Sequence, residues 1–163
     1  MWDRVSQVLK KEGPYMQNNS LIAQFNRIYN DYCSIYRNIA KHFGLSETVF
    51  WILYTLIDEN KPITQSYLCG IIYLPKQTIN SALKKMETDG LITLKPAEDN
   101  RSKKILLTDD GKQLAEKTVE HLRNTENRAL ERFSYEEQHI FIDLFGKYNQ
   151  NLKEELGKLK NGH

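Results

Sequence analysis

The stretch that decides the fold is Lys76–Gly90, which reads KQTINSALKKMETDG. Apolar residues recur in it at three- and four-residue steps, and this spacing predicts a helix with one buried face. That face carries Ile79, Ala82, Leu83 and Met86. Pro75 suits the first helical position because its fixed φ and missing N–H are tolerated there. Gly90 suits a left-handed cap at the end of the helix.

The opposite face of this predicted helix is polar and contains no acid before Glu87. Asn and Gln can form paired hydrogen bonds with adenine, Lys can reach guanine or phosphate, and Ser and Thr allow close approach to a groove. A solvated helix face is the alternative, but such a face usually carries Glu about as often as Lys. The lack of acids favours a nucleic-acid contact made by Lys76, Gln77, Thr78, Asn80, Ser81 and Lys84.

Two further helices are predicted before this one. Ser46 can cap a helix that is apolar nearly all round from Val49 to Ile57, so this helix is expected to be buried. Thr64 can cap a short helix that runs to about Tyr73. A short helix, a tight turn and a helix with a polar outer face form a helix-turn-helix, in which Thr64 is a further candidate DNA contact.

Two short runs suited to strands, Leu91–Leu94 and Lys104–Leu107, follow and predict a hairpin with a charged tip. Such a wing can place Arg101 in a neighbouring minor groove, with Asp99 orienting the guanidinium through an ion pair. Lys103 adds positive charge at the same tip. An ordinary polar turn is the alternative. The hairpin is therefore a second candidate element for binding a polyanion.

Long amphipathic helices are predicted on both sides of this central unit. The first begins at Ser20, its expected N-cap, behind a leader of residues 1–19. After the hairpin, Thr108 opens another helix, and a capping box that begins at Ser134 opens a last helix through Leu159. These helices carry apolar stripes that so small a central unit cannot fully cover. The sequence therefore predicts a homodimer.

Aromatic residues recur on the first of these long helices. Tyr29, Tyr32 and Tyr36, with Trp51 on the next helix, are expected to line a pocket for a small aromatic or apolar effector, because clefts between such elements are common ligand sites. Simple core packing of these rings is the alternative. Cys33 lies among the same tyrosines, and a packed, inert thiol is expected for it.

Composition narrows the function classes. The chain has 163 residues, of which 40% are hydrophobic and 27% charged, an ordinary balance for a folded domain. No apolar run approaches the roughly 18–20 residues of a membrane span, the first residues do not form a secretory signal, and two cysteines cannot build a disulfide framework. A cytoplasmic location is therefore expected. No hydrolase or nucleotide-binding motif occurs, and the sequence nominates no catalytic residue, metal site or cofactor.

Charge is distributed unevenly along the chain. The formal net charge is only +2, yet residues 76–104 hold seven basic and four acidic residues. A local excess of this kind can bind a polyanion even when the whole chain is nearly neutral. Lysines scattered for solubility are the alternative interpretation of the charge taken by itself.

Short motifs follow one another along the chain in this order: Leu45-Ser46, Pro62-Ile63-Thr64-Gln65, Leu68, Lys76-Gln77-Thr78-Ile79-Asn80-Ser81, Gly90-Leu91-Ile92, Asp99-Asn100-Arg101-Ser102 and Leu107-Thr108-Asp109-Asp110-Gly111. No single motif is specific, but their order and spacing from about Leu45 to Lys117 resemble the MarR family of winged-helix transcriptional regulators. Pro75 stands where that family usually has a capping residue.

The resemblance implies a mainly α-helical fold with a small β-hairpin wing. In it, residues 45–111 form a winged helix-turn-helix DNA-binding domain, and residues 20–44 and 112–163 form a helical dimerisation region. The homodimer is expected to bind a pseudo-palindromic operator in double-stranded DNA, under the control of a small-molecule effector, and to have no enzymatic activity. The alternative is a winged-helix protein-interaction module without DNA binding. The polar face of the 76–85 segment and the Arg101 wing favour the regulator.

Overall fold

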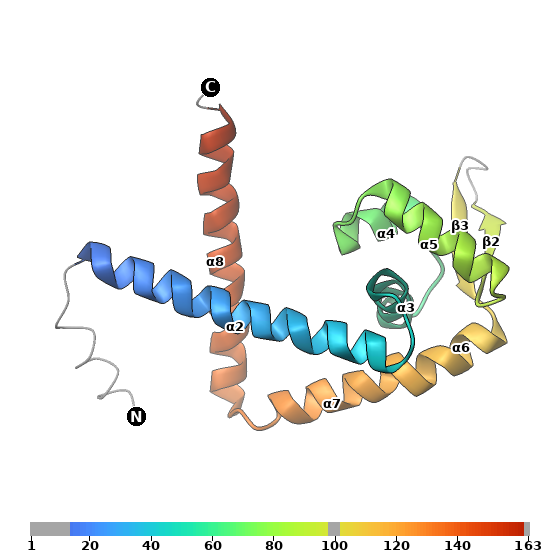
Figure 1. The fold of residues 1–163 in the computed structure, drawn as a ribbon, viewed down its shortest axis with the longest axis horizontal. Coiled ribbons are helices and arrows are strands. Elements are labelled where there is room, and N and C mark those ends of the chain that lie inside the picture. The colour runs from blue at the N-terminus through green and yellow to red at the C-terminus, as the bar shows by residue number, and fades with distance from the viewer. Residues whose placement is uncertain (1–13, 98–101, 162–163) are drawn as a thin grey trace. The chain divides into compact units, whose positions relative to one another are not determined.

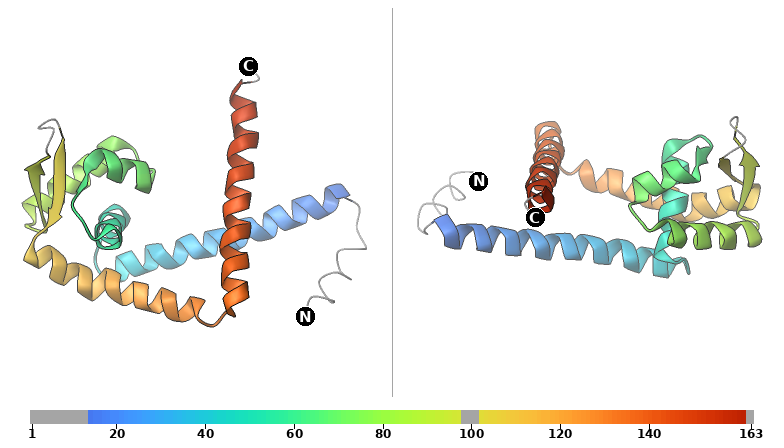
Figure 2. Two further views of the ribbon diagram at one scale, coloured as in Figure 1. Left: turned by 180° about the vertical axis from the view of Figure 1, so that it is seen from behind. Right: turned by 90° about the horizontal axis from the view of Figure 1, so that it is seen from above.

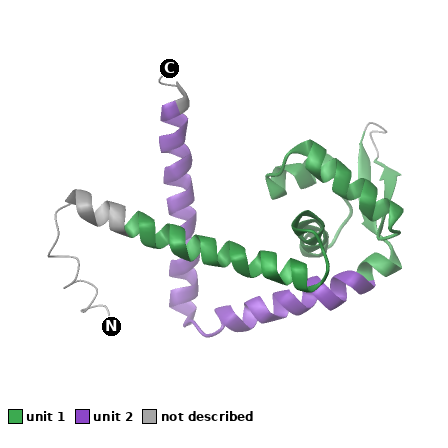
Figure 3. Ribbon diagram, viewed as in Figure 1, with its two compact units in different colours: residues 1–112 green, residues 113–163 purple. Residues whose placement is uncertain are grey.

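The computed structural model of this chain describes residues 14–97 and 102–161. It forms two compact units, one ending at Lys112 and the other beginning at Gln113 (Figure 3). We call them unit 1 and unit 2. The chain is mainly helical, with one small sheet in unit 1 (Figure 1). The predicted fold class, helices with a β wing, is confirmed.

Unit 1 is built around helix α3, which contacts three other helices of the unit. The four helices are α2 (Pro14–His42), α3 (Glu47–Glu59), α4 (Gln65–Ile72) and α5 (Lys76–Thr88). The centre of the core is fully buried and apolar, and its largest members are Phe50, Ile52, Leu53, Leu68, Ile79, Leu83, Met86, Ile92 and Ile105. Three of the four residues predicted for the inner face of α5 belong to it, whereas Ala82 is half-buried.

A three-stranded antiparallel sheet flanks these helices, in the order β1-β3-β2. Its strands are β1 (Ile63–Thr64), β2 (Ile92–Pro96) and β3 (Lys103–Leu107). Ile105 pairs with Leu94 on one side and Ile63 on the other. Helix α4 contacts β1 and β3, and α5 contacts β2, so the helix-turn-helix and the wing pack as one body (Figure 2). The hairpin was predicted, but β1 was not.

The predicted caps of the helix-turn-helix form as hydrogen bonds. The Ser46 hydroxyl accepts from the N–H of Val49 at 3.3 Å, and the Thr64 hydroxyl accepts from the N–H of Tyr67 at 3.2 Å. Gly90 follows α5 with φ +74°, the left-handed conformation expected of it. Pro75 is the N-cap of α5 rather than its first helical residue, one position earlier than the sequence predicted.

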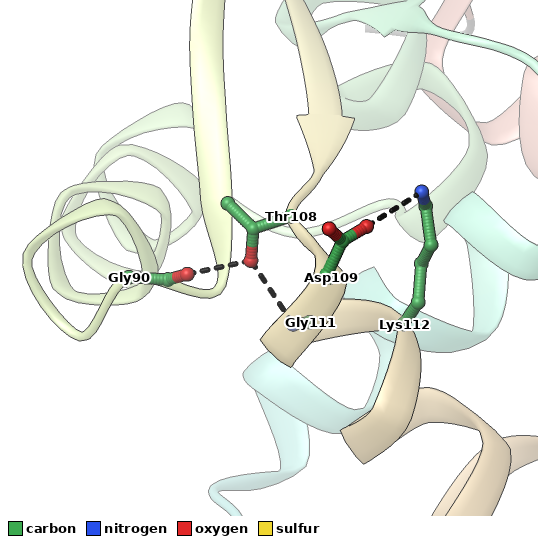
Figure 4. A network of polar contacts seen from close by, with 5 residues as sticks. All are labelled: Gly90, Thr108, Asp109, Gly111 and Lys112. Atoms are coloured by element: carbon green, nitrogen blue, oxygen red, sulfur yellow. Dashed lines mark hydrogen bonds and ion pairs between the residues drawn. The ribbon is translucent and has the colours of Figure 1, made fainter.

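Thr108 ties the end of α5 to the start of α6 (Asp109–Ala115) within unit 1 (Figure 4). Its hydroxyl donates to the Gly90 carbonyl at 2.6 Å and accepts from the N–H of Gly111 at 3.0 Å. Its backbone N–H donates to the Leu91 carbonyl oxygen at 3.1 Å. A Cβ on Gly111 would lie only 2.0 Å from that same oxygen, so the junction requires glycine there. Lys112 adds an ion pair with Asp109 at 3.1 Å.

Unit 2 continues the helix that begins at Asp109. A single π-helical turn, η1 (Glu116–Glu120), joins it to α7 (His121–Leu130), and α8 (Tyr135–Asn161) follows. The capping box before α8 is confirmed: Ser134 accepts from the N–H of Glu137 at 3.2 Å, and Glu137 accepts from the N–H of Ser134 at 2.9 Å. The π turn was not predicted from the sequence.

The start of the first long helix differs from the prediction. Helix α2 begins at Pro14, so Ser20 lies within the helix and is not its N-cap. Proline is well tolerated at the first position of a helix, where its missing N–H would have no partner within the helix in any case. Within residues 14–97 and 102–161, no helix combines the length and apolarity that crossing a bilayer requires.

Candidate nucleic-acid interface

The outer face of α5 is the largest group of predicted site residues that the structure describes. All but one of the predicted α5 residues are exposed, as is the neighbouring Lys85: Lys76, Gln77, Thr78, Ser81, Lys84 and Lys85. The first turn of α5 contains no acid, and a lysine lies in its last turn. The helix therefore presents hydrogen-bonding and positively charged groups along one side, while its other side is fixed in the core of unit 1.

Asn80 departs from this face. It is half-buried, and its Oδ1 atom is buried without a hydrogen-bond partner. An unpaired buried acceptor costs roughly 1–3 kcal/mol. The sequence predicted that Asn80 faces outward like Gln77, but the structure places it at the edge between the exposed and buried sides of α5.

The turn before α5 shapes the start of this face. Tyr73 adopts the left-handed conformation with φ 55° and is 83% exposed. Pro75 makes no side-chain capping bond to α5, because its ring carries no acceptor. The positive end of the helix dipole and Lys76 are therefore not offset by an acid or a capping side chain at this end of α5. Such an end favours anions.

Hydrogen bonds at Thr64 and Tyr67 connect α4, the first helix of the helix-turn-helix, to the residues around it. The Thr64 hydroxyl is used as the cap of α4. Tyr67 donates a hydrogen bond to Glu59 Oε1 at 2.8 Å, and this bond to a carboxylate raises the pKa of Tyr67 above its ordinary value of 10.0. Glu59 also pairs with Lys61 at 3.5 Å. Thr64 thus has a clear structural role in addition to its predicted DNA contact.

The wing is described in part. Lys103 is exposed and pairs across the hairpin with Pro96, while Lys104 is half-buried opposite Lys95. The N–H of Ala97 donates to the carbonyl of Ser102 at 2.9 Å and extends the ladder toward the tip. The predicted wing residues Asp99 and Arg101 lie outside the described residues.

The predicted effector residues separate into two sets. Tyr36 is buried, stacks on Trp51 with ring centroids 5.1 Å apart and lies 4.7 Å from Tyr32. Tyr29 is 48% exposed, and a hydrogen bond with the Cys33 side chain raises its pKa above the ordinary value. The structure therefore brings Tyr32, Tyr36 and Trp51 together as a ring cluster, with Tyr29 further out along α2.

A cavity of about 510 Å³ lies elsewhere in unit 1, and Trp51 is the one predicted effector residue that lines it. It is formed by α3, the end of α4 and the turn that leads to α5. Its lining consists of Glu47, Thr48, Trp51, Tyr54, Thr55, Asp58, Glu59, Ile71, Ile72 and Leu74. Sequence reasoning missed this set. The signal was present, because Glu47, Trp51, Tyr54 and Asp58 recur at three- and four-residue steps along one helix face.

A short helix, a tight turn, a second helix with an exposed polar face and a β wing define a winged helix-turn-helix protein. The model of the MarR family matches residues 43–102. The HTH-type transcriptional regulator PecS of Dickeya dadantii is 33% identical over 113 residues, which is 68% of each chain. The chain belongs to the MarR family, and it is a transcriptional regulator by that membership.

Solved structures agree with this assignment. A MarR family regulator from Neisseria meningitidis, NMB1585, superposes with a TM-score of 0.74 at 22% identity, covering 85% of this chain and 97% of its own. A MarR family regulator from Listeria monocytogenes, solved in complex with 26mer DNA, superposes with a TM-score of 0.67 at 25% identity, covering 87% and 95%. The relatives are named as regulators and not as enzymes.

Proposed function

We propose that this protein is a homodimer that binds a pseudo-palindromic operator in double-stranded DNA and so controls transcription. The observation that carries the proposal is the exposed, acid-free polar face of α5, held on a buried apolar base. The Listeria monocytogenes relative in complex with DNA supports the same partner for this chain. We propose no contact of this protein with a membrane.

The DNA contacts divide into base reading and phosphate binding. Gln77 and Ser81 lie near the start of α5, where base edges of a major groove come within reach. Lys76, Lys84 and Lys103 supply charge for phosphates, and Thr78 and Thr64 are candidate phosphate contacts at the same end of the motif. Arg101 enters the minor groove, with Asp99 orienting it.

Dimerisation uses the helices on either side of the DNA-binding domain. We assign residues 45–111 to that domain, residues 20–44 and 112–163 to the dimerisation region, and residues 1–19 to a leader. This assignment is supported by the large apolar side chains that α2 and α8 expose. Contact of such side chains with water is unfavourable, and burial against a partner removes it. The exposed set includes Leu21, Ile22, Ile28, Ile35, Ile140, Phe141, Ile142, Leu144, Leu152, Leu156 and Leu159.

Two measurements test the proposal. Selection of bound sequences from random duplex DNA should yield a site with two half-sites about one helical turn apart. A salt titration on that site should then give a slope of log K against log salt near −5 to −7, because a dimer using about half of its basic residues between Lys76 and Lys104 neutralises roughly six to eight phosphates.

Variants then separate specificity from general affinity. Gln77→Ala should weaken binding by about 1–3 kcal/mol and relax the preferred base at particular positions. Arg101→Ala should weaken binding to most sequences, most strongly where A·T runs narrow the minor groove. Gln113→Ala, an exposed change outside the DNA-binding domain, is the matched control and should bind as wild type does. A flat salt dependence and no selected sequence would instead identify a protein-interaction module.

A further inference from the structure

The cavity of unit 1 has a lining in which acids and aromatic rings lie together. Trp51, Tyr54, Ile71, Ile72 and Leu74 form apolar walls, and three carboxylates complete it at Glu47, Asp58 and Glu59. None of the described residues that line the cavity is a lysine, an arginine or a histidine. At about 510 Å³ it falls in the size range of small-molecule sites, which is roughly 300–1,000 Å³.

Glu47 and Glu59 each pair with a basic side chain outside the lining, and Asp58 also has a polar or charged partner. Arg37 lies 3.7 Å from Glu47, and Lys61 lies 3.5 Å from Glu59. Both basic side chains are 65% exposed and Glu47 is 49% exposed, so water screens these charges, whereas the Glu59 side chain is only 18% exposed. Glu59 also accepts the Tyr67 hydroxyl, which fixes its position. The charged groups that line the cavity itself are therefore all carboxylates.

The aromatic wall is held in place. Tyr36 stacks on Trp51 at 5.1 Å, and Trp51 contacts Tyr54 at 5.5 Å with the ring planes tilted by 57°. Trp51 and Tyr54 therefore both line the cavity and belong to a ring cluster that is held in place by packing. Trp and Tyr faces attract cations placed within about 6 Å of the ring centre, and this attraction strengthens when water is excluded.

We propose that this cavity binds an organic cation with an aromatic or apolar body. The rings and aliphatic side chains take the apolar body, while the carboxylates and the ring faces stabilise the positive charge. An anion of the same shape would meet three carboxylates and is disfavoured. The site therefore selects ligands by their charge as well as by their shape.

Binding here is well placed to affect DNA binding, a consequence that rests on the proposed function. Ile71 and Ile72 end α4, and Leu74 lies in the turn directly before Pro75 and α5. A ligand that packs against these residues acts on the segment that positions the recognition helix. It shifts operator affinity to the extent that it prefers one arrangement of this segment over another.

Two probes of nearly equal shape and opposite charge test the proposal: tetraphenylphosphonium and tetraphenylborate. The chain has two tryptophans, so Trp2→Phe leaves Trp51 as the sole indole reporter. Titration of the full-length protein should show saturable quenching of Trp51 by tetraphenylphosphonium, with calorimetry giving the dissociation constant. Tetraphenylborate should bind at least tenfold more weakly.

A charge-matched pair of double variants locates the site. Glu47→Gln/Asp58→Asn should weaken tetraphenylphosphonium binding about tenfold, the effect of two unit charges about 6 Å away at the dielectric constant of water. Glu120→Gln/Glu131→Gln, which removes two exposed acids of unit 2, should leave it unchanged. Circular dichroism checks that both variants are folded. Equal affinity for the two probes, or an unchanged affinity in the first variant, overturns the proposal.

The test also separates this inference from the proposed function. Operator affinity is measured with and without saturating tetraphenylphosphonium, with tetramethylammonium as a control for ionic strength. An affinity shift produced by the aromatic cation alone supports coupling to DNA. A protein that binds the operator but not the cation overturns the cavity proposal only, whereas one that binds the cation but not DNA overturns the proposed function only.

Discussion

The winged helix-turn-helix of unit 1 buries its large apolar side chains, whereas helix α8 of unit 2 exposes them. In the first, large side chains from three helices and the sheet are fully buried. In the second, no residue between 135 and 159 is buried, and Phe141, Leu144 and Leu159 are at least 55% exposed. The first region buries its large apolar residues within the chain, while the second leaves them exposed, as the proposed dimer interface would require.

Helix α2 shows the same contrast within a single helix. Tyr36 and Ala40, near its C-terminal end, are buried, and this end contacts α3 through the Tyr36–Trp51 stack. Leu21 and Ile28, nearer its start, are 51% and 71% exposed. The C-terminal end of α2 therefore packs within unit 1, while the part nearer its start leaves large apolar side chains exposed, as α8 does.

The largest expected effect comes from charging the exposed stripe of α8. Phe141→Asp/Leu152→Asp should raise the dimer dissociation constant by at least about a thousandfold, since each residue of this kind contributes about 2 kcal/mol to an interface and a homodimer carries each substitution twice. Sedimentation should show monomer or aggregate. Hydrogen exchange should still find α5 protected in the monomer while α8 exchanges freely.

The polar side of the same helix provides the control. Lys147→Gln/Gln150→Glu makes the same change in net charge at exposed positions between the two apolar ones, on the side away from the apolar stripe, and should leave the dimer intact. If the first variant sediments as wild type does, α8 is not part of an interface and the contrast between the two regions has another cause. A wild-type chain that is a well-folded monomer at micromolar concentration leads to the same conclusion.

Within unit 1, Gly111→Ala should be the most destabilising small substitution. Its Cβ would lie 2.0 Å from the Leu91 carbonyl oxygen, so the junction around Thr108 must move. We expect a loss of about 3 kcal/mol in the free energy of unfolding, measured by urea denaturation. Gly70→Ala, whose Cβ meets nothing within 4 Å on α4, should instead gain up to about 1 kcal/mol. Similar losses in both variants would contradict this explanation.

The sequence predicted most of the fold because the helix-turn-helix depends on local signals. The hydroxyl caps at Ser46, Thr64 and Thr108, and the left-handed Gly90, all form as expected. Strand β1 was missed because two residues cannot display an alternating pattern, and its pairing with β3 is a long-range contact. The early start of α2 was missed because Ser20 was predicted as its N-cap and residues 1–19 as a leader, although Pro14 also suits a first helical position.

The sequence predicts which residues form the polar face of α5, but not how deeply each of them is buried. Exposure of the polar α5 residues follows from helical periodicity. The half-buried position of Asn80 depends on how α5 rolls against its neighbours, and a helical pattern does not determine that angle. The cavity was missed for a different reason. The helix that carries most of its lining was predicted to be buried, and only tertiary packing with α4 shows that its polar residues share a space.

The different exposure of Gln77 and Asn80 predicts a difference in DNA binding. Gln77→Ala removes an exposed amide and should cost about 2 kcal/mol of operator affinity. Asn80→Ala removes a buried, unpaired acceptor, so it should cost less than half of that and should not lower the free energy of unfolding. Fluorescence anisotropy with the selected operator measures the first quantity, and urea denaturation the second. A larger affinity loss for Asn80→Ala would show that its side chain turns outward on DNA.

The smallest expected effect tests whether the two regions fold separately. Ser46→Ala and Ser134→Ala each remove one N-cap, a loss of about 1 kcal/mol. If the winged helix-turn-helix is stable without a partner, denaturation shows one transition independent of protein concentration and one that moves to higher denaturant as concentration rises, because dimerisation stabilises only the latter. Ser46→Ala should then shift the first transition and Ser134→Ala the second. A single concentration-dependent transition that both substitutions shift equally would mean that the domain and the dimer form in one cooperative step, and that the buried core of unit 1 is not sufficient by itself.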